Sequence, residues 1–134
     1  TPATTKGFVM EFIHAPKACA SVGPYSHCVK AGSTYYLCGQ VPFHPVTGEV
    51  VGNGMKDQAV QTLANMKAVL EAAGLAVTDI AKPTVFVTNM DDFAAFNEVY
   101  AAFMGEHRPA RVCVEVSNIA HGCLLEMDAI CFKE

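Results

Sequence analysis

The stretch RPARVCVEV, residues 108–116, decides the fold, because it predicts a strand with two unlike faces. A Pro-Ala corner leads into a run of β-prone valines, and successive side chains of a strand point to opposite sides of its sheet. One face carries Val112, Val114 and Val116, and the other carries Arg111, Cys113 and Glu115. We expect the valines to face a helix-covered core, which places an arginine, a thiol and a carboxylate on the uncovered face.

The closing stretch CLLEMDAICF, residues 123–132, sorts in the same way. Its apolar face comprises Leu125, Met127, Ala129 and Cys131, whereas Glu126 and Asp128 point in the opposite direction. If the two strands are neighbours, the charged groups of both meet on one uncovered sheet face. Ordinary solvated charges would explain such a face. However, Ile130 and Phe132 share it, and an apolar sheet face is commonly covered by a partner subunit.

Two amphipathic helices are predicted, over residues 55–73 and 91–105. Apolar residues recur at three- and four-residue spacing in both: Met55, Ala59, Leu63, Met66, Leu70 and Ala73 in the first, and Phe93, Phe96, Tyr100 and Phe103 in the second. Asn53 is the expected N-cap of the first helix, and Gly74 and Gly105 are expected to end the two helices.

Further strands are predicted at residues 21–32, 33–41 and 82–89, with the last two at 110–118 and 123–132. The order of strands, helix, strand, helix and strands indicates an α+β fold, with a mixed sheet and both helices packed on one face. We expect a single domain over residues 10–134. Residues 1–9 are interpreted as an N-terminal extension, either native or left from expression.

The composition is that of one globular domain. The chain has 134 residues, of which 51% are apolar, and a net charge of −4. A chain of this length can bury roughly two-thirds of its unfolded surface. The acidic balance and the lack of a basic cluster argue against nucleic-acid binding through phosphate contacts, and the apolar runs are too short to span a membrane.

Six cysteines and five histidines fit no metal motif, because CxxC and HxxxH spacings are missing. The first residues are too short and too interrupted for a signal-peptide core. We therefore expect no metal site, free thiols, and a reducing compartment, either the cytoplasm or the mitochondrion. Cys28, Cys123 and Cys131 are interpreted as small core hydrophobes.

Arg111 follows the rigid Pro-Ala corner at the mouth of its strand. The planar guanidinium group of arginine matches a carboxylate with two parallel hydrogen bonds, so this position suits a carboxylate ligand. A salt bridge to Glu115 or Glu126 is the alternative interpretation.

Five segments together resemble the YjgF/YER057c/RidA family in order and spacing. They are APKACASVGPYSHCVKAG, YYLCGQVPFHPVTGEVV, QTLANMKAVLEAAG, VFVTNMDDFAAFNEVYAAFMGEHRPARVCVEV and LLEMDAI, and the likeness spans residues 14–132. The resemblance implies a chorismate-mutase-like fold and a homotrimer whose sheets face inward, with ligand sites in the clefts between subunits. It also implies hydrolysis of 2-imino acids and their enamine tautomers to 2-oxo acids and ammonia, without a metal or organic cofactor.

The resemblance further assigns roles to individual residues. Arg111 corresponds to the arginine that binds the substrate carboxylate, and Glu126 to the glutamate that positions or deprotonates the attacking water or protonates the leaving amine. Cys113 corresponds to a position of backbone contact with the ligand; a nucleophilic role for its thiol is disfavoured, because no histidine base lies at a recognisable spacing. Four further positions correspond to the pocket: Tyr25 as a wall, Gly39 as a close backbone approach, Cys38 beside it, and Asn97 on the second helix.

Several positions differ from the usual family pattern. Cys38 stands where a serine is common, so a hydroxyl donor is replaced by a weaker thiol donor. Ala120 and His121 replace a proline and a basic residue, and His27-Cys28 stands where Gln-Ala is usual. We expect the changes at residues 38, 120 and 121 to affect the substrate preference rather than the type of reaction, and we assign no catalytic role to His27 and Cys28.

Two other classes of function stay open at this point. One is a protein that binds small carboxylates or acts as a redox-regulated chaperone through its thiols. The other is an RNA-cleaving inhibitor of translation, a role associated with some relatives, against which the acidic charge argues.

Overall fold

The computed structural model of the protein describes residues 9–134. The extension predicted for residues 1–9 therefore lies, apart from Val9, outside the described residues. Six strands and two helices follow in chain order: β1 (Met10–Ile13), β2 (Cys28–Ala31), β3 (Thr34–Gln40), α1 (Met55–Ala72), β4 (Ile80–Val87), α2 (Phe93–Met104), β5 (Val112–Glu115) and β6 (Leu125–Phe132).

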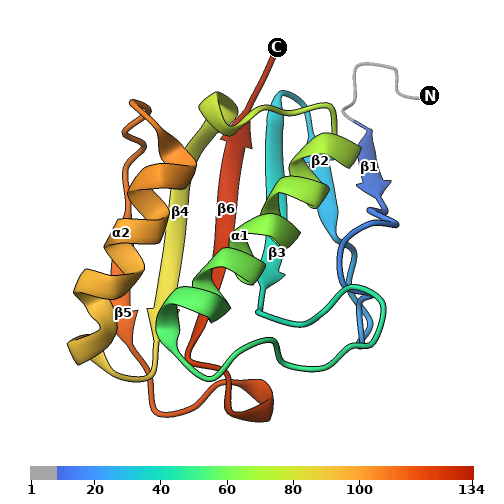
Figure 1. The fold of residues 1–134 in the computed structure, drawn as a ribbon. Coiled ribbons are helices and arrows are strands. Elements are labelled where there is room, and N and C mark those ends of the chain that lie inside the picture. The colour runs from blue at the N-terminus through green and yellow to red at the C-terminus, as the bar shows by residue number, and fades with distance from the viewer. Residues whose placement is uncertain (1–8) are drawn as a thin grey trace.

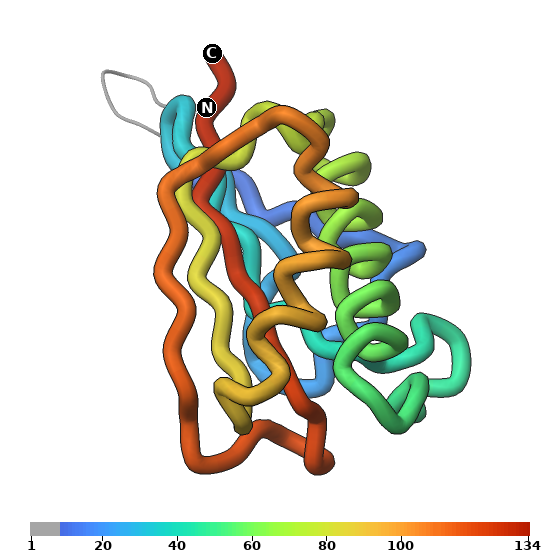
Figure 2. The backbone as a smooth tube through the Cα atoms, turned by 60° about the vertical axis from the view of Figure 1, so that its left-hand side comes forward, coloured from blue at the N-terminus to red at the C-terminus, as the bar shows by residue number. Residues whose placement is uncertain are grey.

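The strands form one mixed sheet in the order β1-β2-β3-β6-β4-β5. Among the strands of residues 9–134, only the β4–β5 pair is parallel, because α2 is the crossover connection that returns the chain to the same end of the sheet. Both helices lie on one side of the sheet, with α1 over its centre and α2 over β4 and β5 (Figures 1 and 2). The predicted α+β class, with two helices on one face, is confirmed.

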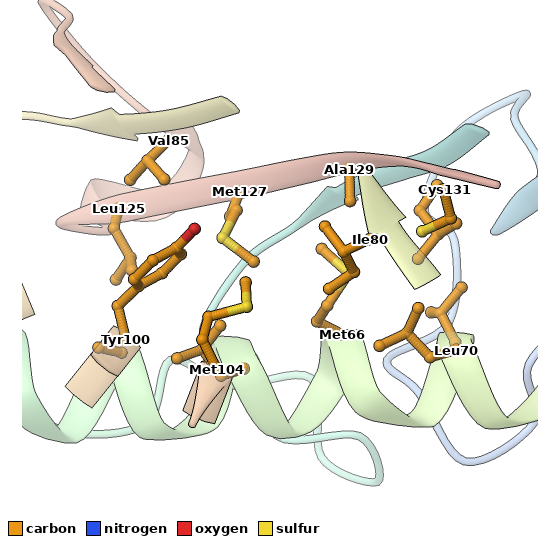
Figure 3. Close-up of a cluster of buried hydrophobic side chains, with 14 of the residues drawn as sticks. Met66, Leu70, Ile80, Val85, Tyr100, Met104, Leu125, Met127, Ala129 and Cys131 are labelled. Atoms are coloured by element: carbon orange, nitrogen blue, oxygen red, sulfur yellow. The ribbon is translucent and has the colours of Figure 1, made fainter. Parts of the chain in front are cut away.

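The main core lies between α1, α2 and the helix-facing side of the sheet. Figure 3 shows Met66 and Leu70 of α1 directed toward Ala129 and Cys131 of β6, and Leu125 and Met127 of β6 beside Tyr100 and Met104 of α2. Met66, Leu70 and Leu125 have no exposed surface. The predicted stripe of the first helix and the predicted faces of β6 are therefore confirmed. In the second helix Phe96, Tyr100 and Phe103 pack in or against the core as predicted, whereas Phe93 does not belong to it and Met104 does. The two helices end as expected, with Gly74 and Gly105 in left-handed backbone conformations of φ +75° and φ +63°.

Two buried amides of α1 fix the loops at the ends of β3 and β6. The Asn65 side chain donates to the carbonyl oxygens of Val41 and Phe43, both at 2.9 Å. The Gln58 side chain accepts from the backbone N–H of Leu124 at 2.8 Å and donates to the Gly52 carbonyl at 3.1 Å. These bonds hold the segments that flank Cys38 and Glu126 against the helix layer.

Some element predictions are wrong in their boundaries. Strand β1 was not predicted, because three of its four residues are exposed and show no burial pattern. The strand predicted at 21–32 is confined to Cys28–Ala31, since the preceding Gly-Pro segment stays irregular. The N-cap of α1 is Gly54 rather than Asn53, and no side chain caps this helix end.

The prediction for β5 and its neighbour is also wrong. Strand β4 lies between β5 and β6, so the two polar strands are not adjacent. The faces of β5 are inverted as well: Val112 and Val114 are exposed on the open face, whereas Cys113 packs against the core under α2. The cause is that the open face is itself apolar, so hydrophobicity does not distinguish the two sides of this edge strand.

The open face of the sheet carries a continuous apolar row. Phe12, Val29, Tyr36 and Ile130 are register partners on four successive strands. Phe12 is 67% exposed and Tyr36 is 48% exposed, which is unusual for aromatic side chains on a regular sheet. Neither helix in the described part of the chain has the length and apolar character needed to cross a membrane.

Candidate functional site

Arg111 lies in a slot built by α2. Its Nη1 donates to the Asn97 side-chain oxygen at 2.8 Å. Its guanidinium carbon lies 4.7 Å from the ring centre of Tyr100 and 5.3 Å from that of Phe93. Phe93, Asn97 and Tyr100 are spaced by four and three residues, so one helix face supplies all three contacts.

These contacts orient the guanidinium group while using only part of its hydrogen-bonding capacity. A guanidinium group carries five N–H donors in a planar fork, so the Asn97 bond leaves donors for a carboxylate. A cavity of about 450 Å³ opens beside it, lined by Asn97, Tyr100, Ala101, Arg108, Pro109 and Arg111. We call this cavity the arginine half-site.

A second cavity, of about 340 Å³, lies at the ends of β3 and β6. Tyr25, Cys38, Gly39, Ala120 and Glu126 are among its lining residues. A Cβ atom on residue 39 would overlap the Glu126 carboxylate, so glycine is required for this side chain to occupy its position. We call this cavity the glutamate half-site.

The glutamate half-site favours protonated groups. Burial, and then the neighbouring charge of Asp128, raises the pKa of the Glu126 carboxyl group above its ordinary value. Burial also raises the pKa of the Cys38 thiol to about 11, with the Gln40 hydrogen bond acting in the opposite direction and the charges of Glu126 and Asp128 adding to the rise. Cys38 is therefore a neutral thiol near pH 7, and its sulfur accepts from the Gln40 amide at 3.1 Å.

Cys113 lies with Arg111 on the helix-covered side of β5. Its side chain packs against the main core, and burial raises its pKa while the charge of Arg111 opposes that shift. A partly buried thiol with a raised pKa is a poor nucleophile. This geometry favours a packing role for Cys113.

The predicted site residues thus form two groups that do not meet within one chain. Arg111, Asn97 and Cys113 lie on the helix side near β5, whereas Tyr25, Cys38, Gly39 and Glu126 lie by β3 and β6. The prediction that Arg111 and Glu126 share one sheet face is wrong. Glu115 contacts neither group, because its carboxylate accepts from the backbone N–H of Met90 at 2.8 Å.

His27 is a contributor that the sequence analysis left without a role. It is 2% exposed; its Nδ1 accepts from the Ala15 backbone N–H at 2.9 Å, and its Nε2 lies 2.8 Å from the Cys19 carbonyl oxygen. Since Nδ1 is an acceptor, Nε2 carries the proton and donates to Cys19. His27 therefore ties segment 15–19 to β2, behind the wall that carries Tyr25.

All six cysteines are free thiols. Within residues 9–134, no three potential metal-ligating side chains come together. The side chains that line the two half-sites include guanidinium, amide, thiol, phenol and carboxyl groups.

Comparison with known proteins identifies many relatives. A family model described as endoribonuclease L-PSP matches residues 14–133. A RutC family protein of Pyrococcus horikoshii is 48% identical over 124 residues, which cover 92% of this chain and 98% of the relative. These matches extend through both half-sites.

Two solved structures show the same fold. The crystal structure of Escherichia coli TdcF with bound serine is 42% identical, with a TM-score of 0.87 over 92% of this chain and 99% of that chain. TdcF is named as a candidate reactive intermediate deaminase. RidA from an Antarctic Psychrobacter species is 41% identical, with a TM-score of 0.88 over 92% of this chain and 99% of that chain.

Replacing His27 tests its role as a backbone clamp. His27→Leu is expected to lower the free energy of unfolding by roughly 2–4 kcal/mol, because the Ala15 N–H and the Cys19 carbonyl lose their partners. A glutamine amide can both accept and donate, so His27→Gln is expected to stay within about 1 kcal/mol of wild type. Urea denaturation measures both values, and equal losses in the two variants would contradict the clamp.

The raised pKa of Glu126 predicts a pH-dependent stability difference. The folded protein holds this proton more tightly than the unfolded chain, so the contribution of Glu126 to stability falls as pH rises from the ordinary carboxyl pKa through the raised one. Glu126→Gln cannot ionise and is expected to gain stability relative to wild type as pH rises from the ordinary carboxyl pKa of 4.5 through the raised one.

Denaturation at matched protein concentrations across this pH range measures the difference. Glu71→Gln, an exposed position on α1, controls for the loss of one negative charge. A difference between wild type and Glu126→Gln that stays constant with pH would show that burial does not perturb this carboxyl group.

Proposed function

The chain belongs to the YjgF/RidA family, and on that premise we propose that it hydrolyses reactive 2-imino acids, and their enamine tautomers, to 2-oxo acids and ammonia. The observation that carries the proposal is the preformed position of Arg111 between Asn97, Phe93 and Tyr100. A guanidinium group held in this way recognises the one group that all these substrates share, the carboxylate beside the imine carbon.

The complete site forms between subunits of a homotrimer. Within one chain the arginine and glutamate half-sites lie apart, and each holds only part of the chemistry that imine hydrolysis needs. The exposed row of Phe12, Val29, Tyr36 and Ile130 on the open sheet face provides an apolar surface for subunit contact. Packing the sheets inward brings the arginine half-site of one subunit to the glutamate half-site of the next.

Hydrolysis proceeds by addition of water and loss of ammonia. Arg111 fixes the carboxylate, and the iminium carbon is already electrophilic. Glu126 takes a proton from the attacking water as the carbon–oxygen bond forms, and returns it to the nitrogen. The carbon–nitrogen bond then breaks, the hydroxyl loses its proton as the 2-oxo acid forms, and ammonia leaves as ammonium. No oxidant, metal or organic cofactor is needed.

The raised pKa of Glu126 suits this double role. A carboxyl group is an effective proton carrier when its pKa approaches the working pH, because it is then available in both protonation states. Tyr25 walls the pocket, and the neutral Cys38 thiol offers a weak donor where relatives have a hydroxyl. Asn97 orients Arg111 rather than the substrate.

The carboxylate clamp is tested by removing the guanidinium group. Arg111→Ala is expected to reduce kcat/KM by about a hundredfold or more without unfolding the protein, and Arg111→Lys is expected to recover only part of this loss, because an ammonium group cannot form the planar fork. Ammonia release is followed from imino acid generated in place by a dehydratase.

Lys67→Ala, which removes an exposed cation from α1, is the matched control. Unchanged turnover in Arg111→Ala would overturn the clamp. A wild-type protein that binds 2-oxo acids without accelerating hydrolysis would be a carboxylate-binding protein instead. Cleavage of RNA that survives further purification would favour the activity after which the family model is described.

The shared site is tested by mixing two defective variants. Arg111→Ala lacks the arginine half-site, and Glu126→Gln lacks the proton carrier. If the two are denatured together and refolded as mixed trimers, about a quarter of the sites pair an intact arginine half with an intact glutamate half, so activity is expected to return. Each variant refolded alone is the control. A mixture no more active than the average of the separate variants would show that each site belongs to one chain.

A further inference from the structure

We propose that Arg108 is a specificity-determining residue, and that the arginine half-site selects ligands with a second carboxylate, such as 2-imino and 2-oxo dicarboxylic acids. This inference rests on the proposed function for the reaction, and it adds the class of substrate. The segment that connects α2 to β5 can be followed in Figure 1. Arg108 belongs to this segment, three residues before Arg111.

The guanidinium group of Arg108 is held in place. Its Nη1 donates to the carbonyl oxygens of Gly105 at 2.6 Å and His107 at 2.9 Å. Both acceptors belong to the turn that ends α2, so the side chain is anchored to its own backbone. Anchoring lowers the rotamer entropy that an arginine loses when it binds a ligand, and the remaining N–H donors are available to an anion.

Arg108 and Arg111 line the same cavity. This cavity also carries the Asn97 amide, and none of its described lining residues is acidic. The Arg111 guanidinium carbon lies 4.7 Å from the Tyr100 ring centre, and the charges of Arg111 and Arg108 both oppose the rise that burial causes in the pKa of the Tyr100 hydroxyl. Within residues 9–134 neither arginine forms an ion pair with a carboxylate; their hydrogen bonds go to an amide and to backbone carbonyls.

Two neighbouring cations without a counter-charge repel one another, and a ligand with two negative groups relieves this repulsion. A 2-imino acid with a simple alkyl side chain offers one carboxylate, which Arg111 binds. A 2-imino dicarboxylate of five carbons offers a second one to Arg108. The volume of about 450 Å³ accommodates a ligand of this size beside both groups.

The alternative role for Arg108 is purely structural, as a cap on the last carbonyls of α2. The two roles make different predictions. A cap affects the stability of the protein and the turnover of all substrates alike. A specificity residue affects only those ligands that carry the second carboxylate.

The test compares wild type with Arg108→Met, which keeps an unbranched side chain of similar reach but removes the charge, and with Arg108→Lys, which keeps the charge. kcat/KM is measured for 2-iminobutanoate, generated by a threonine dehydratase, and for 2-iminoglutarate, generated from glutamate by a flavin-dependent oxidase. The affinities of the products 2-oxobutanoate and 2-oxoglutarate are measured separately by calorimetry, which requires no turnover.

We expect wild type to prefer the five-carbon diacid in both assays. Arg108→Met is expected to lower kcat/KM and product affinity for the diacid by about tenfold or more, and to leave both values for the mono-acid within about twofold of wild type. Arg108→Lys is expected to recover part of the loss for the diacid. Equal changes for both ligands, or a wild type without preference for the diacid, would overturn the inference. If wild type hydrolyses neither imine but 2-oxoglutarate binding still depends on Arg108, the selectivity stands and the proposed reaction fails.

Discussion

Two helices can bury only one face of a six-stranded sheet, and the other face of this sheet is not polar. On the side that the helices cover, Met66, Leu70 and the helix-facing residues of β6 are buried. The opposite side presents Phe12, Tyr36 and Ile130 to water, at a cost of about 25 cal/mol for each Å² of apolar surface left exposed. Proteins with such an exposed apolar sheet face commonly cover it by subunit assembly. The proposed assembly would also account for the two parts of the candidate site, because residues that face a neighbouring subunit can act together with the residues of that subunit.

Helix α2 both packs against the core and holds Arg111, because residues three and four positions apart lie on the same helix face. Phe96 and Met104 point into the core, while Phe93, Asn97 and Tyr100 surround Arg111. An aromatic ring and an amide hold a cation without neutralising it, whereas a carboxylate at position 97 would compete with any anionic ligand. The glutamate half-site has the opposite character, because burial and Asp128 raise the pKa of its carboxyl group. In the proposed reaction the two halves are complementary: one supplies fixed positive charge, and the other carries the proton.

The sequence predicts those parts of the fold where the local residue pattern is compatible with only one structure. Gly74 and Gly105 end helices because few other residues adopt a left-handed conformation, and β6 sorts correctly because charge and apolar groups alternate along it. The two faces of β5 are predicted wrongly, because the sequence does not distinguish valines on an uncovered sheet face from valines in a core. The site residues were named individually from the family resemblance. Their division between two cavities depends on β4 lying between β5 and β6, and no residue pattern within those strands encodes this order. The clamp at His27 likewise needs Ala15 and Cys19, which only the folded chain brings to its ring.

The place of β6 in the sheet also bears on how the protein is made. The last strand of the chain lies between β3 and β4, and its pairing joins Thr34 to Phe132 across most of the sequence. Before β6 leaves the ribosome, the strands already synthesised have no central partner and cannot form a continuous sheet. The sheet is therefore completed only after β6, the last of the described strands, has been synthesised. A chain that stops a few residues short loses the element that joins its two halves, so truncated products are left with unpaired strand edges that quality-control proteases and chaperones can recognise.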